Sequence, residues 1–223
     1  MRWTQAVPVL VLTGCSFLPR GPSLGPDEVV ARLRASARYV RDFEAEAEVS
    51  KGGAGWLRAH IWAARPGRLR IEVSDPLRIR TFEVLVRDGL VVLRTEGGEV
   101  NMRLPLPPLD LVALASGLPD VRDGELLSFR SGRGGYELTM RRRGGTVHRM
   151  SLGKRCLLIR EEYRGEDGIL LGGRTLDEYE RIGKVRLPRR MSLFWEGGKV
   201  EVRFLWQKVN QGLSENLFEL EVG

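Results

Sequence analysis

The sequence predicts a mainly β protein, in which antiparallel strands form one curled sheet, an incomplete β-barrel, accompanied by two helices. First, residues 43–49, 69–73 and 200–204 alternate between apolar and polar side chains, which is typical of antiparallel strands with one covered and one wet face. Second, Gly-Gly and Asp-Gly pairs recur along the chain and supply the backbone conformations that two-residue hairpins require. Third, helical spacing of apolar residues is clear in only two segments.

The start of the chain resembles a bacterial lipoprotein signal. One positive charge, Arg2, precedes an apolar stretch over residues 6–12, which has the size of a signal-peptide core and is far shorter than the roughly 20 residues that span a bilayer. Residues 12–15, Leu-Thr-Gly-Cys, match the lipobox pattern. The resemblance implies that residues 1–14 are removed and that the thiol of Cys15, a nucleophile, takes a diacylglycerol. The alternative is an apolar N-terminus with a chance cysteine.

Lipidation implies a protein that works at a membrane surface outside the cytoplasm, because several inserted acyl chains make an anchor effectively permanent. The residue after Cys15 is Ser16 and not Asp. An Asp there resembles an inner-membrane retention signal, so we expect the periplasmic face of the outer membrane. We expect no cofactor apart from the covalent lipid and no nucleic-acid partner. The net charge of +7 adds attraction to anionic lipid surfaces.

Residues 15–26 are predicted to form the lipidated tether, because residues 16–26 contain three Pro and two Gly and such breakers do not fold alone. Residues 27–223 are expected to form a single domain. It begins with a helix over about residues 27–41, for which Asp27 is the expected N-cap. The apolar positions at helical spacing are Val30, Leu33, Ala37 and Val40.

Roughly ten to twelve strands in meander order are expected between residues 43 and 207, which are too many for a flat sheet. One apolar segment, residues 104–117, interrupts the meander. Pro107 and Pro108 suit a helix start, and Gly117 suits a helix end. A short and almost wholly apolar helix in a β protein must be buried, so we place it on the concave face of the curled sheet.

This combination of elements resembles the LolA/LolB family of bacterial lipoprotein-localisation factors. Residues 64–73 look like the family's third strand, residues 86–93 resemble its Asp-Gly hairpin, and residues 187–206 resemble its final hairpin. Residues 209–220 resemble the LolA-type ending. The resemblance covers most of residues 27–222 and implies a curled sheet that receives acyl chains.

Within that family the outer-membrane receptor LolB is itself a lipoprotein, so Cys15 places the chain on the LolB side. Residues 74–77, Ser-Asp-Pro-Leu, are similar to the LolB loop whose protruding leucine is associated with delivery of cargo to the membrane. The resemblance therefore implies that Leu77 contacts the membrane, and the alternative is a leucine tucked under its own turn. Arg78 departs from the glycine that the family usually has there.

The sequence offers little for catalysis, and we expect no enzyme activity. His60 and His148 lie far apart, each on a predicted strand. The neighbouring carboxylates of Glu161 and Glu162 point to opposite faces of a strand. No Cys and His spacing suits a metal, and Cys156 in an apolar, strand-like run is predicted to be a buried hydrophobic residue.

Binding of apolar ligands has better support, because the usual ligand site is concave and mainly apolar. The alternative is that these same side chains are ordinary core. The residues predicted to line the concave cavity are Trp56, Trp62, Leu69, Ile71, Phe82, Val84, Leu111, Leu114, Trp195, Phe204 and Trp206.

Two functions remain open from the sequence. One is a lipoprotein that receives acyl chains of lipoproteins or lipids, from a donor such as a periplasmic lipoprotein carrier, and places them in the outer membrane. The other is a structural lipoprotein that uses the same fold as a docking platform in an envelope complex, because a fold does not fix a function.

Overall fold

The computed structural model describes residues 24–53, 55–75, 80–87, 89–103, 110–121 and 124–219. The first six strands are β1 (Asp42–Lys51), β2 (Leu57–Ala64), β3 (Arg68–Ser74), β4 (Arg80–Arg87), β5 (Leu90–Thr95) and β6 (Gly98–Arg103). The other seven are β7 (Glu125–Gly132), β8 (Gly135–Arg141), β9 (Val147–Gly153), β10 (Leu158–Arg164), β11 (Leu170–Ile182), β12 (Val185–Trp195) and β13 (Gly198–Val209). The helices are α1 (Pro26–Tyr39), α2 (Leu111–Ser116) and the 3-10 helix η1 (Glu215–Phe218).

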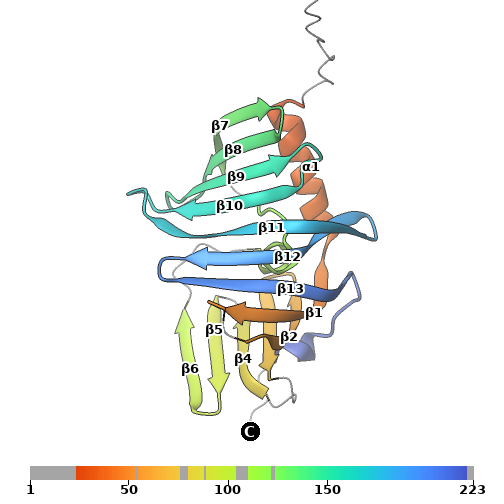
Figure 1. Cartoon of the computed structure of the whole chain (residues 1–223), viewed down its shortest axis with the longest axis vertical. Helices are drawn as coiled ribbons and strands as arrows, with labels where there is room; N and C mark the ends of the chain where they lie inside the picture. The colour runs from red at the N-terminus through yellow and green to blue at the C-terminus, as the bar shows by residue number, and fades with distance from the viewer. Residues whose placement is uncertain are drawn as a thin grey trace, which may run out of the picture.

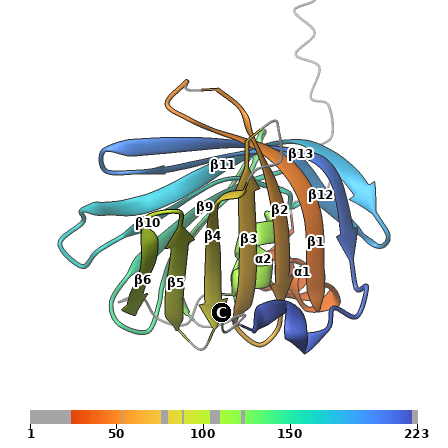
Figure 2. The same cartoon turned by 90° about the horizontal axis from the view of Figure 1, so that it is seen from below.

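All thirteen strands belong to one antiparallel sheet, in the order β6-β5-β4-β3-β2-β1-β13-β12-β11-β10-β9-β8-β7. The sheet therefore consists of two meanders that meet where β1 pairs with β13, and its two edges are β6 and β7 (Figure 1). Viewed from below, the sheet bends around α1 and α2, which lie on its concave side (Figure 2). The predicted fold class, a mainly β protein with a curled and open sheet, is confirmed.

The helix α1 forms as the apolar spacing predicts, but its start differs. The N-cap is Gly25, with Pro26 in the first turn, and Asp27 lies inside that turn rather than at the cap. Proline suits this position because its missing N–H would have had no partner there. Val30, Leu33 and Ala37 are buried against the sheet, as predicted.

The strands bury one face and expose the other, as their alternation predicts. In β2 the side chains of Ala59, Ile61 and Ala63 are buried in the main core, which also contains residues of α1 and α2. Trp62 lies on the opposite face, in a second and smaller cluster.

The second cluster is covered by the end of the chain. Phe218 of η1 is buried there against Ala64, Leu85 and Val92 on the outer face of the sheet. The Arg70 side chain donates a hydrogen bond of 3.0 Å to the carbonyl oxygen of Leu217 and so fixes this segment. In this part of the sheet α2 packs on the inner face of β2 and β3, and η1 packs on the outer face of β3 and β4.

The junction of the two meanders contains a β-bulge. Ala47 on β1 pairs with Phe204, whereas the preceding Glu46 pairs with Trp206, so β13 has one extra residue at this point. The Phe204 ring packs edge-on against Phe43, with ring centroids 6.0 Å apart. A bulge changes which face the following side chains take, so Phe204 and Trp206 end on different faces of the sheet.

The mid-chain helix α2 begins after Asp110, whose carboxylate caps it by accepting a hydrogen bond from the amide of Ala113. Pro107 and Pro108, the predicted helix start, lie outside the described residues. The helix ends at Gly117, as predicted, with a φ of 75°. A side chain at Gly117 would collide with the ring of Pro188, so glycine is needed for close approach as well as for its backbone.

Within the described ranges, no helix combines the length and the apolar character needed to cross a membrane. The predicted signal, Cys15, the tether up to residue 23 and Leu77 all lie outside the described residues. Cys156 is buried, as predicted, but it lies in the turn between β9 and β10, with a φ of 57°, and not on a strand. Burial raises the pKa of its thiol and so suppresses reactivity.

Candidate functional site

The candidate site is the concave face of the sheet together with the segment that fills it. We call residues 110–121 the plug. It consists of Asp110, α2 and the five residues that follow, and it packs against β1, β2 and β3. Leu111, Val112, Ala113 and Ala115 are all buried there. The expected placement of an apolar helix on the concave face is therefore found.

Seven of the predicted ligand-binding residues belong to one apolar cluster around the plug. These are Leu69, Ile71, Phe82, Val84, Leu111, Leu114 and Phe204. They come from β3, β4, α2 and β13. Alternate positions of a strand share a face, so the residues of β3, β4 and β13 point inward and form an apolar wall, on which Leu111 and Leu114 of α2 pack.

Two tryptophans predicted to share that wall lie on the outer face instead. Trp62 alternates with the inward residues of β2 and stacks on His60, with ring centroids 3.8 Å apart. Trp206 follows the bulge in β13 and approaches the same His60 ring edge-on. Its indole N–H donates a 2.8 Å hydrogen bond to the carboxylate of Glu46 and thereby lowers the pKa of that group.

The two remaining tryptophans are also away from the wall. Trp56 is 40% exposed, and the guanidinium of Arg203 lies 4.8 Å from its ring centroid. Trp195 ends β12 and is 42% exposed. The predicted cavity lining is therefore corrected to an aliphatic and phenylalanine wall from which all four of these tryptophans are absent.

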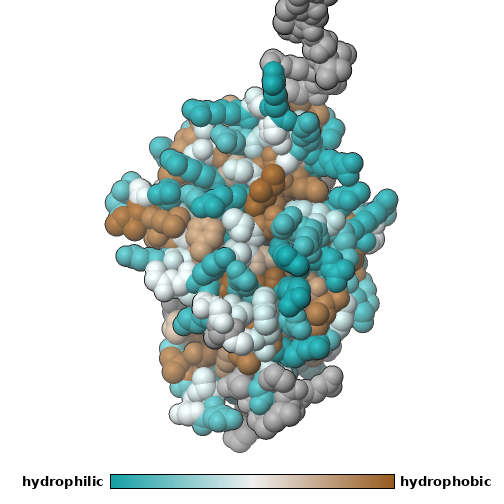
Figure 3. Space-filling view, viewed as in Figure 1, coloured by the Kyte–Doolittle hydropathy of each residue, from teal (hydrophilic) through white to brown (hydrophobic). Residues whose placement is uncertain are grey.

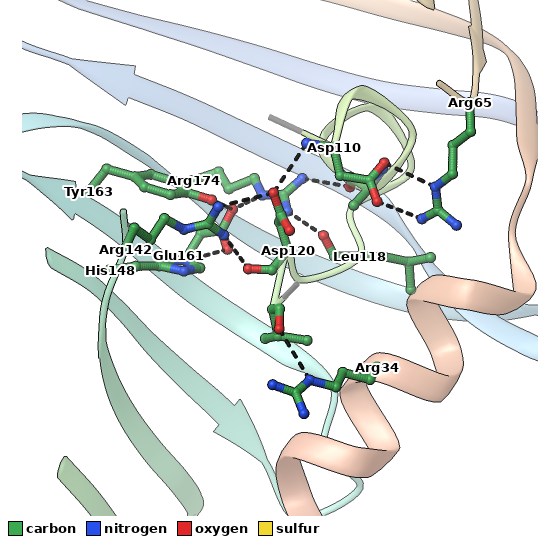
Figure 4. Close-up of polar contacts among 12 residues, drawn as sticks. Arg34, Arg65, Asp110, Leu118, Asp120, Arg142, His148, Glu161, Tyr163 and Arg174 are labelled. Carbon is green, nitrogen blue, oxygen red and sulfur yellow. Dashed lines mark hydrogen bonds and ion pairs between the residues drawn. The ribbon is translucent and has the colours of Figure 1, made fainter. Parts of the chain in front are cut away.

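The plug is fastened to the sheet by a buried arginine that the sequence analysis did not identify. Arg174 on β11 is 1% exposed. Its guanidinium donates hydrogen bonds to the backbone carbonyl oxygens of Leu114 at 2.5 Å and Leu118 at 2.6 Å. Its Nε donates to Glu161 Oε1 at 2.6 Å (Figure 4). The Arg174 side chain thus links the C-terminal end of α2 to β10 and β11.

The carboxylate beneath Arg174 is held in its charged form. Glu161 is fully buried, and His148 Nε2 lies 2.9 Å from its Oε2. Burial alone would raise the pKa of Glu161, but the charge of Arg174 and the contact with His148 outweigh it and lower the pKa to about 2. The ring of Tyr163 stacks on His148, with centroids 4.3 Å apart, and burial raises the pKa of its phenol.

A second buried arginine holds the other end of the plug. Arg142, in the turn after β8, forms an ion pair of 3.2 Å with Asp120 and also donates to the backbone carbonyl oxygen of Asp120. The carboxylate of Asp120 in turn accepts a hydrogen bond of 3.1 Å from the amide of Asp110. The two ends of the plug are therefore linked to each other.

A third arginine connects the plug to α1. Arg65 forms an ion pair of 2.6 Å with Asp110 and donates a 2.9 Å hydrogen bond to the carbonyl oxygen of Ala37 on α1. Arg34 of α1 donates at 3.3 Å to the carbonyl oxygen of Val121 (Figure 4). Arginine side chains from the sheet, from the turns after β2 and β8 and from α1 thus bind the plug, through its backbone carbonyl oxygens and through the carboxylates of Asp110 and Asp120.

The chemistry of this arrangement is structural. The buried charges bind one another and the plug backbone, which is what buried ions need to be tolerated. In the part of the chain that the structure describes, no three His, Cys, Asp or Glu side chains are grouped as a metal ion would require.

A hollow of about 780 Å³ borders β9 to β13, and no plug residue is in its lining. The plug covers the concave apolar wall.

No family model matches the sequence, and no curated protein matches it. Several solved structures have a similar fold. A DUF1329 family protein from Desulfovibrio piger has a TM-score of 0.64 at 15% identity, over 86% of this chain and 95% of that one. A LolA superfamily protein from Nitrosomonas europaea has a TM-score of 0.58 at 12% identity, over 86% and 97%.

The chain has a LolA-like fold. A domain from Vibrio parahaemolyticus named for outer membrane lipoprotein sorting shares it, with a TM-score of 0.63 at 15% identity over 86% of this chain and 95% of that one. The predicted resemblance to the LolA/LolB family is thus confirmed in the fold. The apolar wall and the plug lie on the concave side of this sheet (Figure 2).

Proposed function

We propose that this protein is a lipid-anchored envelope lipoprotein that binds acyl chains of lipoproteins or lipids on its concave face. It would then help to place them in the outer membrane. The observation that carries the proposal is the apolar wall of β3, β4 and β13 beneath a short apolar helix, in a LolA-like sheet. Binding and release need no covalent step, only a donor with lower affinity and a membrane with higher affinity.

An acyl chain would reach the wall by moving α2 away from the strands, and Leu114 would then line the space that opens. Each methylene that leaves water contributes about 0.8 kcal/mol. The chain would cover the same side chains that Leu111 and Val112 now cover, so much of the apolar contact is exchanged rather than gained. Such an exchange suits a carrier, because a cargo that is bound with little net gain can also be released.

Anchoring and delivery rest on two residues of the sequence. Lipid on Cys15 would hold the protein at the membrane, and Leu77 would insert into the bilayer while cargo is transferred. A leucine side chain that leaves water for lipid gains about 1.5–3 kcal/mol. That energy biases a transient contact without anchoring the domain.

A docking platform is the second candidate, and the fastening of the plug favours it. Arg174, Arg142 and Arg65 bind the plug at both of its ends, and Arg174 and Arg142 are themselves buried. A plug that never leaves the wall would make the protein a static fold, and its partners would then bind elsewhere on the surface.

Binding of a fluorescent fatty acid to the full chain that carries Cys15→Ala separates the two candidates. An acyl-binding protein should bind the probe at micromolar concentration, and Leu114→Glu should weaken that binding by placing a carboxylate among the apolar side chains of the site. Leu171→Glu is the matched control, because Leu171 is exposed on β11 and undergoes the same chemical change. Binding should be unchanged in this control.

Leu114→Glu also threatens the fold, so circular dichroism and Leu114→Ala accompany it. The alanine variant removes apolar surface without adding charge and should weaken probe binding less than the glutamate variant. No probe binding by the parent chain would favour the platform. Equal loss in the Leu114 and Leu171 variants would mean that the probe does not occupy the concave face.

A further inference from the structure

The net charge of the protein is concentrated at one end of the sheet. Residues 124–164, which form β7 to β10 and their turns, contain ten Lys and Arg against four Glu, or +6 of the total of +7. The rest of the chain is therefore close to neutral. We call this four-stranded region the basic end.

Most cations of the basic end have no ionic partner. Among the described residues, no carboxylate pairs with a set of seven exposed side chains in this region. That set is Arg130, Arg133, Arg141, Arg143, Arg149, Lys154 and Arg155. Elsewhere on the sheet exposed arginines are commonly paired, as Arg58 is with Glu46 and Arg203 is with Glu48.

The chain enters the domain beside the basic end. The amide of Leu24 donates a hydrogen bond of 3.4 Å to the hydroxyl of Tyr136 on β8. Figure 1 shows the start of α1 next to the ends of β7 and β8. Leu24 is nine positions after Cys15, and nine residue steps span at most about 32 Å. A lipid on Cys15 would thus keep Leu24, and the start of β8 that Leu24 contacts, within about that distance of the bilayer.

The surface of the basic end also suits a membrane. Its outer face carries projecting hydrophilic side chains, visible in the upper part of Figure 3. Leu127 on the edge strand β7 is 40% exposed and supplies an apolar side chain at the surface of the basic end. Basic side chains around an apolar one favour a surface of anionic lipid headgroups.

We propose that the basic end docks on an anionic membrane surface, through the unpaired cations of β7 to β10, and so sets the orientation of the anchored domain. This inference rests on the lipid anchor in the proposed function, and it adds the face of the domain that lies on the bilayer. Lipid phosphate groups would replace the missing carboxylates as ionic partners.

Vesicle binding of the full chain with Cys15→Ala tests this docking without the lipid. The protein should cosediment with phosphatidylcholine vesicles that contain phosphatidylglycerol and much less with pure phosphatidylcholine vesicles. Binding should fall steeply with salt, because exposed charges are screened. Equal binding to both kinds of vesicle, or binding that does not depend on salt, would overturn the proposal.

A triple charge reversal locates the contact. Arg130→Glu, Arg133→Glu and Arg149→Glu together should lower affinity for the anionic vesicles by about 100-fold, from the contribution expected of each cation near a charged surface. The control reverses Lys51, Arg181 and Arg186 to Glu, which are exposed outside the basic end. It should lower affinity only slightly, although its net charge is the same.

Equal losses in the two triple variants would mean that net charge and not this face drives binding, and the proposal would then be wrong. The fatty-acid probe, measured on the same samples, separates this test from the proposed function. Loss of vesicle binding with full probe binding is the result expected of the basic-end variant. A parent chain that binds anionic vesicles but no probe would refute acyl binding and leave the docking face intact.

Discussion

Arg174→Met removes the cation that fastens the plug while keeping most of the volume of the side chain. In the structure the Arg174 guanidinium meets Glu161 at 2.6 Å and the carbonyl oxygen of Leu118 at 2.6 Å. After substitution the Glu161 carboxylate would keep only His148 and Tyr163 as partners, and the plug carbonyls would lose their donor. The variant is therefore expected to be much less stable.

The magnitude follows from the burial of the pair. Removal of one partner of a buried ion pair costs about 3–5 kcal/mol, because the other charge stays buried without compensation. Glu161 is completely buried, so we expect the free energy of unfolding to fall within that range. Glu161→Gln in the same chain should recover part of the loss, since it removes the uncompensated charge. The double variant should therefore be more stable than the sum of the single effects predicts.

Denaturant unfolding of the parent chain, both single variants and the double variant measures this coupling. Arg189→Met is the control, because Arg189 is half-exposed and pairs with Glu180 at 3.7 Å. Exposed pairs contribute about 0–1 kcal/mol. A cost below about 1 kcal/mol for Arg174→Met, or strict additivity in the double variant, would refute the conclusion that Arg174 fastens the plug through Glu161.

The remaining predictions concern acid stability, the anchor and the loop. The pKa of Glu161 is lowered from 4.5 to about 2, so its contribution is complete above pH 4.5 and disappears as the pH falls toward 2; Glu161→Gln should remove this part of the acid dependence in unfolding titrations. Cys15→Ala should release the protein from membranes, and persistent palmitate labelling would contradict the anchor. Leu77→Glu should slow transfer of cargo to liposomes with little change in thermal stability, and clearly earlier unfolding would show that Leu77 is core.

Much of the fold could be predicted because alternation is a local signal. In residues 43–49 each apolar side chain is separated from the next by a charged one, and the structure buries Phe43, Ala45 and Ala47. The number of strands was harder to predict from the sequence. The predicted ten to twelve became thirteen, because strands such as β7 have both faces partly exposed and lack a clear pattern.

The apolar wall could be predicted from the same signal, but the tryptophans could not be placed by hydrophobicity alone. Trp62 stands between the inward Ile61 and Ala63, so its position in β2 indicates the outer face. Phe204 and Trp206 have the same parity in the sequence, yet one extra residue in β13 separates their faces. Nothing in the local pattern of β13 predicts a bulge that only its pairing with β1 creates.

The polar network that fastens the plug was the hardest part to predict. Arg174 has the same strand parity as the buried Leu176, and His148 the same parity as Met150, so a charged or polar residue in an inward position was a usable signal. The partners of Arg174 were not predictable, because Leu114 and Leu118 lie about sixty positions away and offer only backbone oxygens. Every residue has a backbone carbonyl oxygen, so the residue types in a sequence do not show which of these oxygens accepts a hydrogen bond from Arg174.

The pairing of β1 with β13 has a consequence for how the chain assembles. Phe43 lies opposite Val209, so the seam that unites the two halves of the sheet forms only when nearly the whole polypeptide is present. Contacts between residues so far apart in sequence slow folding, because the loop between them must close first. Until β13 arrives, β1 is an open edge that can pair with other chains. When the chain is made or exported from its N-terminus, β1 to β6 appear before β13. These six strands would then need protection from aggregation until β13 pairs with β1.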